Sequence, residues 1–380
     1  MEKTLASTKE MVSNKYIPDD IHFSILSKLP FKSLKRFESV RKSWSLLFEN
    51  THFMNMFRNN LLSNSYYDGA SLLLRVSENH KEVFYSLSGE RFENKVKLDW
   101  FVSCEDHFIF RIFGFGSINA TLCLYDFSND NHGNIVLWNP SAHTIKFLPP
   151  SPALGLYDDS ISGEAMDSDD IFYYLHGFGY DDVINDYKVI RNIRFADACL
   201  DPLWEICSLR SNEWRELEVD MPYSLVCVEG TQVYMNGVCH WLCEEDSPSG
   251  SCLVSFHLSN EVFFTTPLPS EVEDWSHDLA LWINLAVLNE SVALVSYHED
   301  TTTFQISILG EFGMKETWTK LFNIGPLSCV ERPIGVGTKG EILFIRKDKE
   351  LVLLDLNTQL IEKLGYKANS PYYCSVIIYK

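Results

Sequence analysis

Glycine and proline, long apolar runs and positive charges are all scarce in this chain. It has only 19 glycines and 14 prolines in 380 residues, which excludes a collagen-like or low-complexity protein. The longest apolar runs, such as Ser375 to Tyr379, fall far short of the ~18–20 residues that cross a bilayer. The N-terminal 15 residues also lack the apolar stretch of a signal peptide. We therefore expect no membrane insertion and no secretion.

Positive charge is low and unevenly distributed. Lysine and arginine number 32 against 52 acidic residues, which gives a net charge of −20. Nucleic-acid binding without sequence preference requires a basic surface, so we expect no nucleic-acid partner. Residues 1–60 hold ten basic and six acidic residues (+4), which leaves 22 and 46 (−24) for residues 61–380. This asymmetry predicts an acidic partner for the N-terminal part, although a solvated helical face explains it equally well.

Cysteine is present without a disulfide framework. Ten cysteines are scattered from Cys104 to Cys374, which indicates thiols in a reducing compartment and predicts a cytoplasmic or nuclear protein, or both. Thiolates and imidazoles are zinc ligands, and Cys239, His240 and Cys243, with Cys252 and His257 downstream, could form such a site, but the paired ligand spacing of a zinc site is missing. Strand alternation places Cys239 and Cys243 on one face and His240 on the other, which favours a buried strand. We expect no metal and no cofactor.

Calcium and phosphate sites are also unfavoured by the sequence. The acidic stretch 167–170 lacks the spaced oxygen ligands and the glycine of a calcium loop, so a solvated loop is the better interpretation. Residues 113–116 and 177–179 each contain two glycines, but neither has the third glycine of a phosphate-binding turn. We interpret both as tight crossings between strands.

Apolar and aromatic residues are abundant enough for a large core. Hydrophobic residues make up 46% of the chain, with 25 Phe, 17 Tyr and 9 Trp, which suits two modules with much sheet. Near the N-terminus, Pro18 suits a first helical turn, and Ile21 and Ile25 follow at helical spacing. Because Pro30 disfavours helical geometry at the preceding residue, this helix should end near Lys28.

A second apolar series follows the proline and also steps by three or four residues, which predicts further short helices. Its members are Leu34, Phe37, Val40, Trp44, Leu47 and Phe48. A module of about 45 residues buries little surface by itself, so an apolar stripe here is expected to meet a partner.

The periodicity changes to two from about residue 70 onward, which predicts a β-rich body. Similar turns recur along it, starting at residues 87, 140, 210, 258, 309 and 356. A period near 50 is typical of kelch-type propeller blades, and we predict six of them. The one long interval contains residues 155–170, which we interpret as a loop insertion. A pair of β-sandwiches is the alternative, because such turns occur in any all-β protein.

The N-terminal pattern resembles the plant F-box. The resemblance covers roughly residues 15–58. It rests on Ile17 to Ile21, Ile25-Leu26, Leu29-Pro30, Lys32 to Leu34, Arg36-Phe37, Val40 and Lys42 to Trp44. Two positions depart from the usual pattern, since Asp20 precedes an isoleucine and Arg41 replaces a frequent cysteine. Neither removes an apolar residue.

The body resembles the F-box-associated domain of plants, both the large general group and the S-locus F-box branch. The motifs that carry this resemblance include Trp138-Asn139-Pro140, Gly177 to Asp181, Asn185 to Val189 and Asn236 to Trp241. The resemblance divides the chain into a flexible tail (1–14), an F-box (15–60), a linker (61–69) and a β-rich, kelch-like recognition domain (70–380).

This resemblance implies a non-catalytic substrate receptor of a ubiquitin ligase. The F-box would dock on a Skp-type adaptor and, through it, on a cullin scaffold, while the β-rich domain captures a target protein that the sequence does not identify. The docking residues carried over by the motif are Ile17, Pro18, Ile21, Leu29, Pro30, Leu34, Val40 and Trp44. Internal helix packing is the alternative for each. The competing class is a cytosolic propeller lectin or hydrolase in which the helices form a cap.

Overall fold

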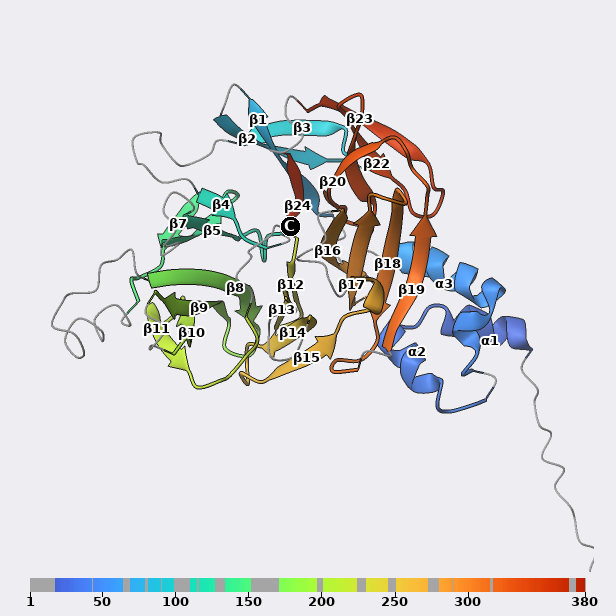
Figure 1. Ribbon diagram of the computed structural model, residues 1–380, viewed down its shortest axis with the longest axis horizontal. Helices are drawn as coiled ribbons and strands as arrows, with labels where there is room; N and C mark the ends of the chain where they lie inside the picture. Colours follow the sequence, from blue (N-terminus) through green and yellow to red (C-terminus); the bar gives the residue numbers. More distant parts are fainter. Residues whose placement is uncertain are drawn as a thin grey trace, which may run out of the picture.

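The computed structural model shows a small group of helices beside a ring of six sheets (Figure 1). The structure describes residues 18–42, 44–63, 69–78, 81–89, 91–98, 110–114, 116–126, 134–151, 171–196, 201–223, 230–244, 251–272, 280–288, 290–314, 317–368 and 374–379. The predicted tail, the centre of the predicted linker and the predicted insertion 155–170 lie outside these residues. The predicted module boundaries themselves stay a prediction.

The helices form the N-terminal part, which we call the head. They are α1 (Asp19–Leu26), α2 (Phe31–Phe37), the 3₁₀ turn η1 (Leu47–Glu49) and α3 (Thr51–Ser63). All strands follow them in the chain, beginning at Ser71. The predicted order, helices first and sheet afterwards, is confirmed.

Each sheet is a propeller blade of four antiparallel strands. Blade 1 contains β24 (Ser375–Tyr379), β1 (Ser71–Glu78), β2 (Lys81–Ser88) and β3 (Asn94–Leu98). Blade 2 contains β4 (Phe110–Ile112), β5 (Leu122–Asp126), β6 (Ile135–Asn139) and β7 (Thr144–Phe147). Blade 3 contains β8 (Ile171–Asp181), β9 (Asp186–Phe195), β10 (Leu203–Ser208) and β11 (Glu213–Leu217).

The second half of the ring repeats this plan. Blade 4 contains β12 (Gln232–Met235), β13 (Val238–Cys243), β14 (Cys252–His257) and β15 (Phe263–Pro267). The short η3 (Ser270–Val272) precedes blade 5, which contains β16 (Leu281–Leu288), β17 (Ser291–His298), β18 (Thr303–Leu309) and β19 (Trp318–Ile324). Blade 6 contains β20 (Val330–Val336), β21 (Ile342–Arg346), β22 (Glu350–Leu354) and β23 (Ile361–Lys367). The prediction of six blades is confirmed, and the sandwich alternative is wrong.

The last strand closes the ring. β24 pairs antiparallel with β1, with Leu73 opposite Ile377, so the two ends of the β-rich part share one blade. It is the innermost strand of blade 1 and neighbours β20 of blade 6. Each inner strand is paired only within its own blade, and the closed ring protects its free edge by placing the neighbouring blades beside it.

The repeated turns all occupy the same place in a blade. Each one connects the third strand to the outermost strand, as β6 to β7, β10 to β11 and β14 to β15 show. Four of these turns contain a non-glycine residue with positive φ, namely His143, Asn212, Glu261 and Gln359, at 52° to 57°. The connections after β2 and β18 contain positive-φ glycines instead, Gly89 and Gly313. The repeat in the sequence is therefore a repeat of one turn geometry.

The glycine pair in β8 marks a close approach between blades 3 and 4. A Cβ atom at Gly179 would lie 2.5 Å from Leu258 Cδ1 and 2.8 Å from Tyr234 Cδ2. Any side chain there would push the blades apart. The interpretation of Gly177 to Gly179 as a tight strand crossing is confirmed.

Candidate adaptor-docking surface

Two prolines set where the head helices begin. The Pro18 carbonyl accepts hydrogen bonds from the amides of Ile21 (3.1 Å) and His22 (3.2 Å), and the Pro30 carbonyl does the same for Ser33 (2.9 Å) and Leu34 (3.2 Å). Each proline is the N-cap of its helix, with extended backbone angles. Because proline disfavours helical geometry at the residue before it, α1 cannot run through Leu29 into α2. The predicted first helix is confirmed to within two residues at each end.

The interior of the head is largely aromatic. Phe31 packs against Phe48 with ring centroids 5.3 Å apart, and Phe53 stacks on Phe57 at 6.2 Å. Leu34 and Leu47 complete this interior with almost no exposed surface. Burial of each such side chain is worth ~1.5–3 kcal/mol, so these residues hold the short helices together.

The outer side of the head exposes large apolar side chains. Ile21 and Ile25 stand one turn apart on α1 and are 50% and 56% exposed, while Val40 and Leu46 after α2 are 65% and 55% exposed. His22 and Trp44, with ring centroids 6.1 Å apart, bring α1 and the segment after α2 together. We call Ile21, Ile25, Val40 and Leu46, together with the exposed Pro18, the apolar surface of the head. Such a patch is typical of an interaction site.

The predicted docking residues differ in how exposed they are. Pro18, Ile21 and Val40 are exposed, and Leu29, Pro30 and Trp44 are half-buried. Ile17 lies outside the described residues. Their role in docking stays a prediction.

Leu34 does not fit a docking role. It is 0% exposed and packs in the core of the head, so the alternative of internal packing holds for this residue. Ile25 and Leu46 are exposed candidates that the predicted docking residues did not include. The exposure of Ile25 could have been predicted from the sequence, because Ile25 stands four residues after Ile21 on the same helical face.

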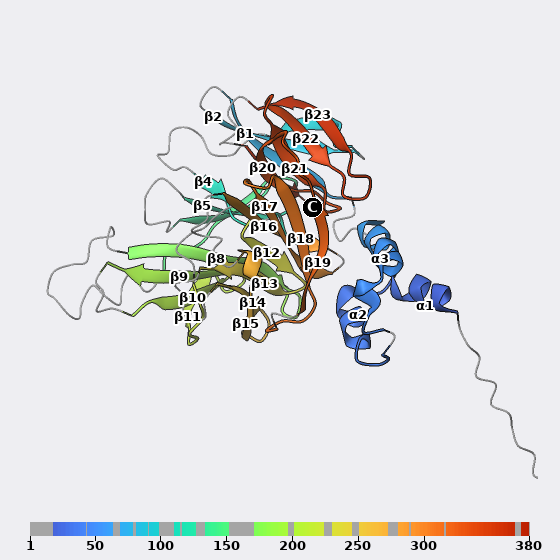
Figure 2. The ribbon, with the colours of Figure 1, turned by 45° about the vertical axis from the view of Figure 1, so that its right-hand side comes forward.

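The opposite side of the head packs against blade 5, as Figure 2 shows for α2, α3 and β19. Lys32 Nζ lies 4.3 Å from the centroid of Phe312, in the turn between β18 and β19. Arg58 Cζ lies 5.5 Å from the centroid of Phe322 on β19. Burial lowers the pKa of both Lys32 and Arg58, and Arg36 adds to the effect at Lys32.

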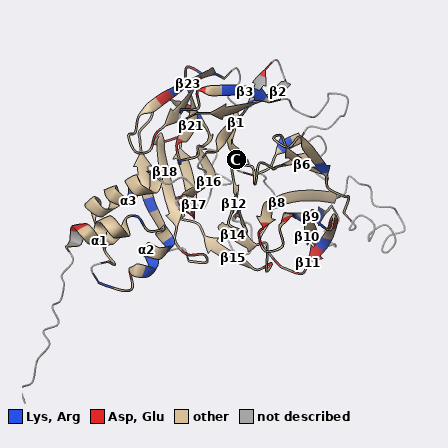
Figure 3. Cartoon of the chain, turned by 180° about the vertical axis from the view of Figure 1, so that it is seen from behind, with Lys and Arg blue, Asp and Glu red and all other residues tan. Residues whose placement is uncertain are grey.

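The basic charge of the head is therefore partly used within the chain. Arg36 Nε lies 3.5 Å from Glu311 Oε1, so α2 meets an acidic residue of blade 5. Figure 3 shows lysine and arginine residues along α2. The predicted asymmetry of charge is real, but part of it serves the junction between head and propeller.

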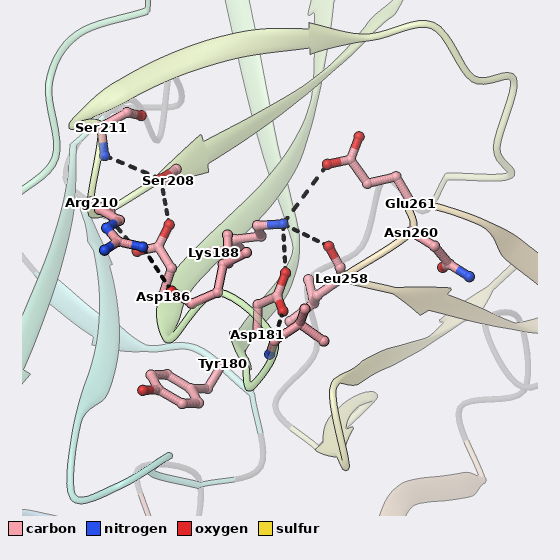
Figure 4. A network of polar contacts seen from close by, with 12 residues as sticks. Tyr180, Asp181, Asp186, Lys188, Ser208, Arg210, Ser211, Leu258, Asn260 and Glu261 are labelled. Carbon is pink, nitrogen blue, oxygen red and sulfur yellow. Dashed lines mark hydrogen bonds and ion pairs between the residues drawn. The ribbon is translucent and has the colours of Figure 1, made fainter.

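The motif from Gly177 to Val189 builds a polar network between blades 3 and 4 (Figure 4). Lys188 Nζ donates to Asp181 Oδ2 at 2.8 Å and to the Leu258 carbonyl at 2.7 Å, and it lies 3.8 Å from Glu261 Oε1. Burial opposes the charge on Asp181, but the hydrogen bonds from Lys188 and from the backbone amides of Val183 and Ile184, with the positive charge of Lys188, together outweigh it. The pKa of Asp181 is therefore lowered. A buried pair with its hydrogen bonds satisfied fixes the geometry of the elements it joins.

The same motif also ties the β8–β9 turn to the next hairpin. Asp186 accepts hydrogen bonds from the Ser208 hydroxyl and, at 2.9 Å, from the Arg210 amide. Arg210 Nη1 donates to the Ile184 carbonyl at 3.0 Å. Asp186 and Arg210 thus connect the two hairpins of blade 3, whereas Lys188 joins blade 3 to blade 4.

The residues considered as zinc ligands pack inside the propeller instead. Cys239 and Cys243 are buried with Trp241 in the core between blades 3 and 4, and burial raises the pKa of both thiols. His240 is also buried and donates or accepts a 2.8 Å hydrogen bond with Ser255. Within the described part of the chain, no group of three or more His, Cys, Asp or Glu side chains is placed to hold a metal ion.

No helix among the described residues combines the length and apolar character needed to span a membrane.

The fold defines a class: a helical head fixed to a closed six-bladed propeller. A family model described as the F-box associated beta propeller domain matches residues 121–361. The chain therefore belongs to the plant F-box proteins that carry an F-box associated propeller domain.

Curated relatives support this assignment over most of the chain. The F-box protein CPR1 of Arabidopsis thaliana is 26% identical over 369 residues, which cover 91% of this chain and 81% of that protein. The F-box/kelch-repeat protein At3g23880 of the same plant is 25% identical and covers 87% of this chain and 85% of its own.

Solved structures resemble the chain only distantly. A mutant of the Aleuria aurantia lectin in complex with alpha-methyl-L-fucoside covers 80% of this chain and 99% of its own, with 8% identity and a TM-score of 0.38. An exo-beta-1,3-galactanase from Clostridium thermocellum reaches a TM-score of 0.36 at 8% identity, over 69% of this chain and 64% of its own. Likenesses at this level carry no argument about function.

Proposed function

We propose that this chain is the substrate receptor of a Skp-cullin-F-box ubiquitin ligase. The observation that supports this most strongly is the apolar surface of the head, which the rest of the described chain leaves uncovered. It lies at the F-box of a chain that belongs to the F-box family. In this role the head docks on a Skp-type adaptor, and the adaptor connects it to a cullin scaffold.

The propeller is the target-binding part in this proposal. A rigid ring of six blades presents loops at its rims, and loops on a rigid scaffold commonly carry recognition. The ubiquitin-transfer chemistry belongs to other subunits, so this chain has no catalytic role of its own. The identity of the target stays open, and the proposed compartment is the cytoplasm, the nucleus or both.

The head is held by blade 5 on one side and free to bind on the other. Lys32, Arg36 and Arg58 fix the inner side through Phe312, Glu311 and Phe322. A partner on the outer side is therefore placed at a defined position relative to the propeller. That arrangement suits a receptor which must present its target in a fixed orientation.

Reconstitution with purified components tests this proposal. The full chain should copurify with a Skp-type adaptor and with a cullin added to it. The Leu29→Ala, Pro30→Ala double variant should lose most of the adaptor, because both residues lie at the turn between α1 and α2. A chain that folds but binds no adaptor, or a double variant that binds as tightly as wild type, would overturn the docking role.

A further inference from the structure

The centre of the propeller contains a cavity that neither the adaptor surface nor the polar network uses. Its volume is about 410 Å³. The walls come from the segment between β4 and β5, from β8 and from β12 and β13, so blades 2, 3 and 4 all contribute. Figure 1 shows these inner strands converging on the middle of the ring.

The lining of this cavity is apolar and aromatic, with a few polar groups. Phe113, Phe178 and Tyr234 supply aromatic surface, and Ser117 and Gln232 add groups that can form hydrogen bonds. Among the described residues that line it, none is Asp, Glu, Lys or Arg. Burial lowers the pKa of His240 to about 3, with smaller contributions from Lys32 and His257, so that ring is neutral at physiological pH.

The walls are held in place by contacts that do not involve a ligand. The Tyr234 hydroxyl donates to the Tyr180 carbonyl at 2.6 Å, and Phe178 stacks on Tyr187 with centroids 5.8 Å apart. The Ser117 amide donates to the Ile378 carbonyl at 2.9 Å, which ties the segment between β4 and β5 to β24. A preformed cavity binds with a smaller ordering cost than one that must assemble.

We propose that this cavity binds an uncharged, mainly apolar small molecule that carries an aromatic or aliphatic body and one or two hydrogen-bonding groups. The volume falls within the ~300–1,000 Å³ range of small-molecule sites, and an apolar lining with a few polar groups is their usual character. A charged ligand is excluded because burying a charge without a partner is strongly unfavourable. This site is independent of the adaptor surface, so the two proposals can fail separately.

A matched pair of fluorescent probes tests the charge preference. N-phenyl-1-naphthylamine is uncharged, and 8-anilinonaphthalene-1-sulfonate has the same ring system with a negative charge. In titrations of the full chain, we expect saturable binding of one uncharged probe per chain and at least tenfold weaker binding of the sulfonate. No saturable binding of the uncharged probe, or equal binding of the two, would overturn the proposal.

Two lining variants and one control locate the probe. Ser117→Phe fills the cavity, and Gln232→Glu places a carboxylate in its wall without changing its size. Each should weaken binding of the uncharged probe at least tenfold, while Ser259→Phe on the exposed turn after β14 should leave it unchanged. Circular dichroism of each variant verifies folding, and the isosteric Gln232→Glu keeps the test valid if Ser117→Phe does not fold. Unchanged binding in a folded lining variant would exclude this cavity.

Native mass spectrometry distinguishes a free small molecule from the apolar side chain of a bound protein. The full chain purified from plant cells should carry an added mass that is released on denaturation and is missing from Ser117→Phe. If the wild-type chain carries no such mass although the uncharged probe binds, the small-molecule proposal is overturned in favour of a protein side chain. Adaptor copurification should be the same for all these variants.

Discussion

The two sides of the head use different chemistry. The side that faces blade 5 places cations over aromatic rings, as Lys32 does over Phe312 and Arg58 over Phe322. The outer side presents apolar side chains such as Ile21 and Val40, which the described chain leaves half or more exposed. Internal contact and partner contact are thus separated within a group of short helices.

This difference shows which side is complete without a partner. The aromatic rings offset part of the cost of burying the cations of Lys32 and Arg58, so this junction forms within the chain itself. Exposed apolar surface gains free energy only when something covers it. The outer side of the head is therefore the side at which binding adds stability.

The largest effect should come from the core of the head. Leu34→Ala removes a fully buried side chain and should lower the free energy of unfolding by about 2–5 kcal/mol. Val40→Ala truncates an exposed side chain and should change it by no more than ~0.5 kcal/mol. Urea unfolding of the two variants provides the comparison. Equal losses would show that the two sides of the head are not distinct.

A smaller effect should appear as acid sensitivity beside the junction. The His240 ring lies 5.4 Å from Phe312, and burial holds its pKa near 3 rather than near 6.5. Because the folded pKa is lowered, the unfolded chain binds the proton more readily. The contribution of the neutral His240 ring to the free energy of unfolding is therefore complete above pH 6.5. It is lost as the pH falls toward 3, by up to ~1.4 kcal/mol per pH unit.

His240→Gln should reduce the pH dependence of the free energy of unfolding between pH 6.5 and 4.5. The exposed His52→Gln serves as the control and should leave the slope unchanged. Urea unfolding at a series of pH values gives both profiles. If the two variants have the same slope as wild type, His240 is not the acid-sensitive group.

The sequence predicted much of this architecture for physical reasons. Pro18 and Pro30 act through local backbone geometry, so the start of each helix follows from the residues themselves. The six turns require the same backbone reversal in every blade, which leaves a repeat that can be counted. Both signals are local, and both predictions were confirmed by the structure.

Long-range packing was not accessible in the same way. Helical spacing identified the apolar residues of both helices, with Ile21 on the first and Leu34 on the second, but not which of them the core of the head would cover. The buried Lys188 of blade 3 contacts the Leu258 carbonyl in blade 4, 70 residues further along the chain. The central cavity likewise combines three blades, so it exists only in the closed ring.

A still smaller effect should come from the junction with blade 5. A double-mutant cycle of Lys32→Met and Phe312→Leu should give a coupling of ~0.5–2 kcal/mol. The matched pair Arg36→Met and Glu311→Gln is more exposed, so its coupling should be ~0–1 kcal/mol and should fall in high salt. Urea unfolding of the single and double variants measures both. A coupling near zero for Lys32 and Phe312 would show that the Lys32 cation does not stabilise the junction.

The most direct test of the central claim is the affinity of the full chain for a Skp-type adaptor, measured by isothermal titration calorimetry. Ile21→Asp places a charge in the apolar surface of the head, whereas Ile145→Asp does so at a comparably exposed site on β7 of the propeller. We predict a loss of at least about 30-fold for Ile21→Asp, as for an interface hot spot, and wild-type affinity for Ile145→Asp. Equal affinity of wild type and Ile21→Asp would contradict the proposal that the outer side of the head binds the adaptor.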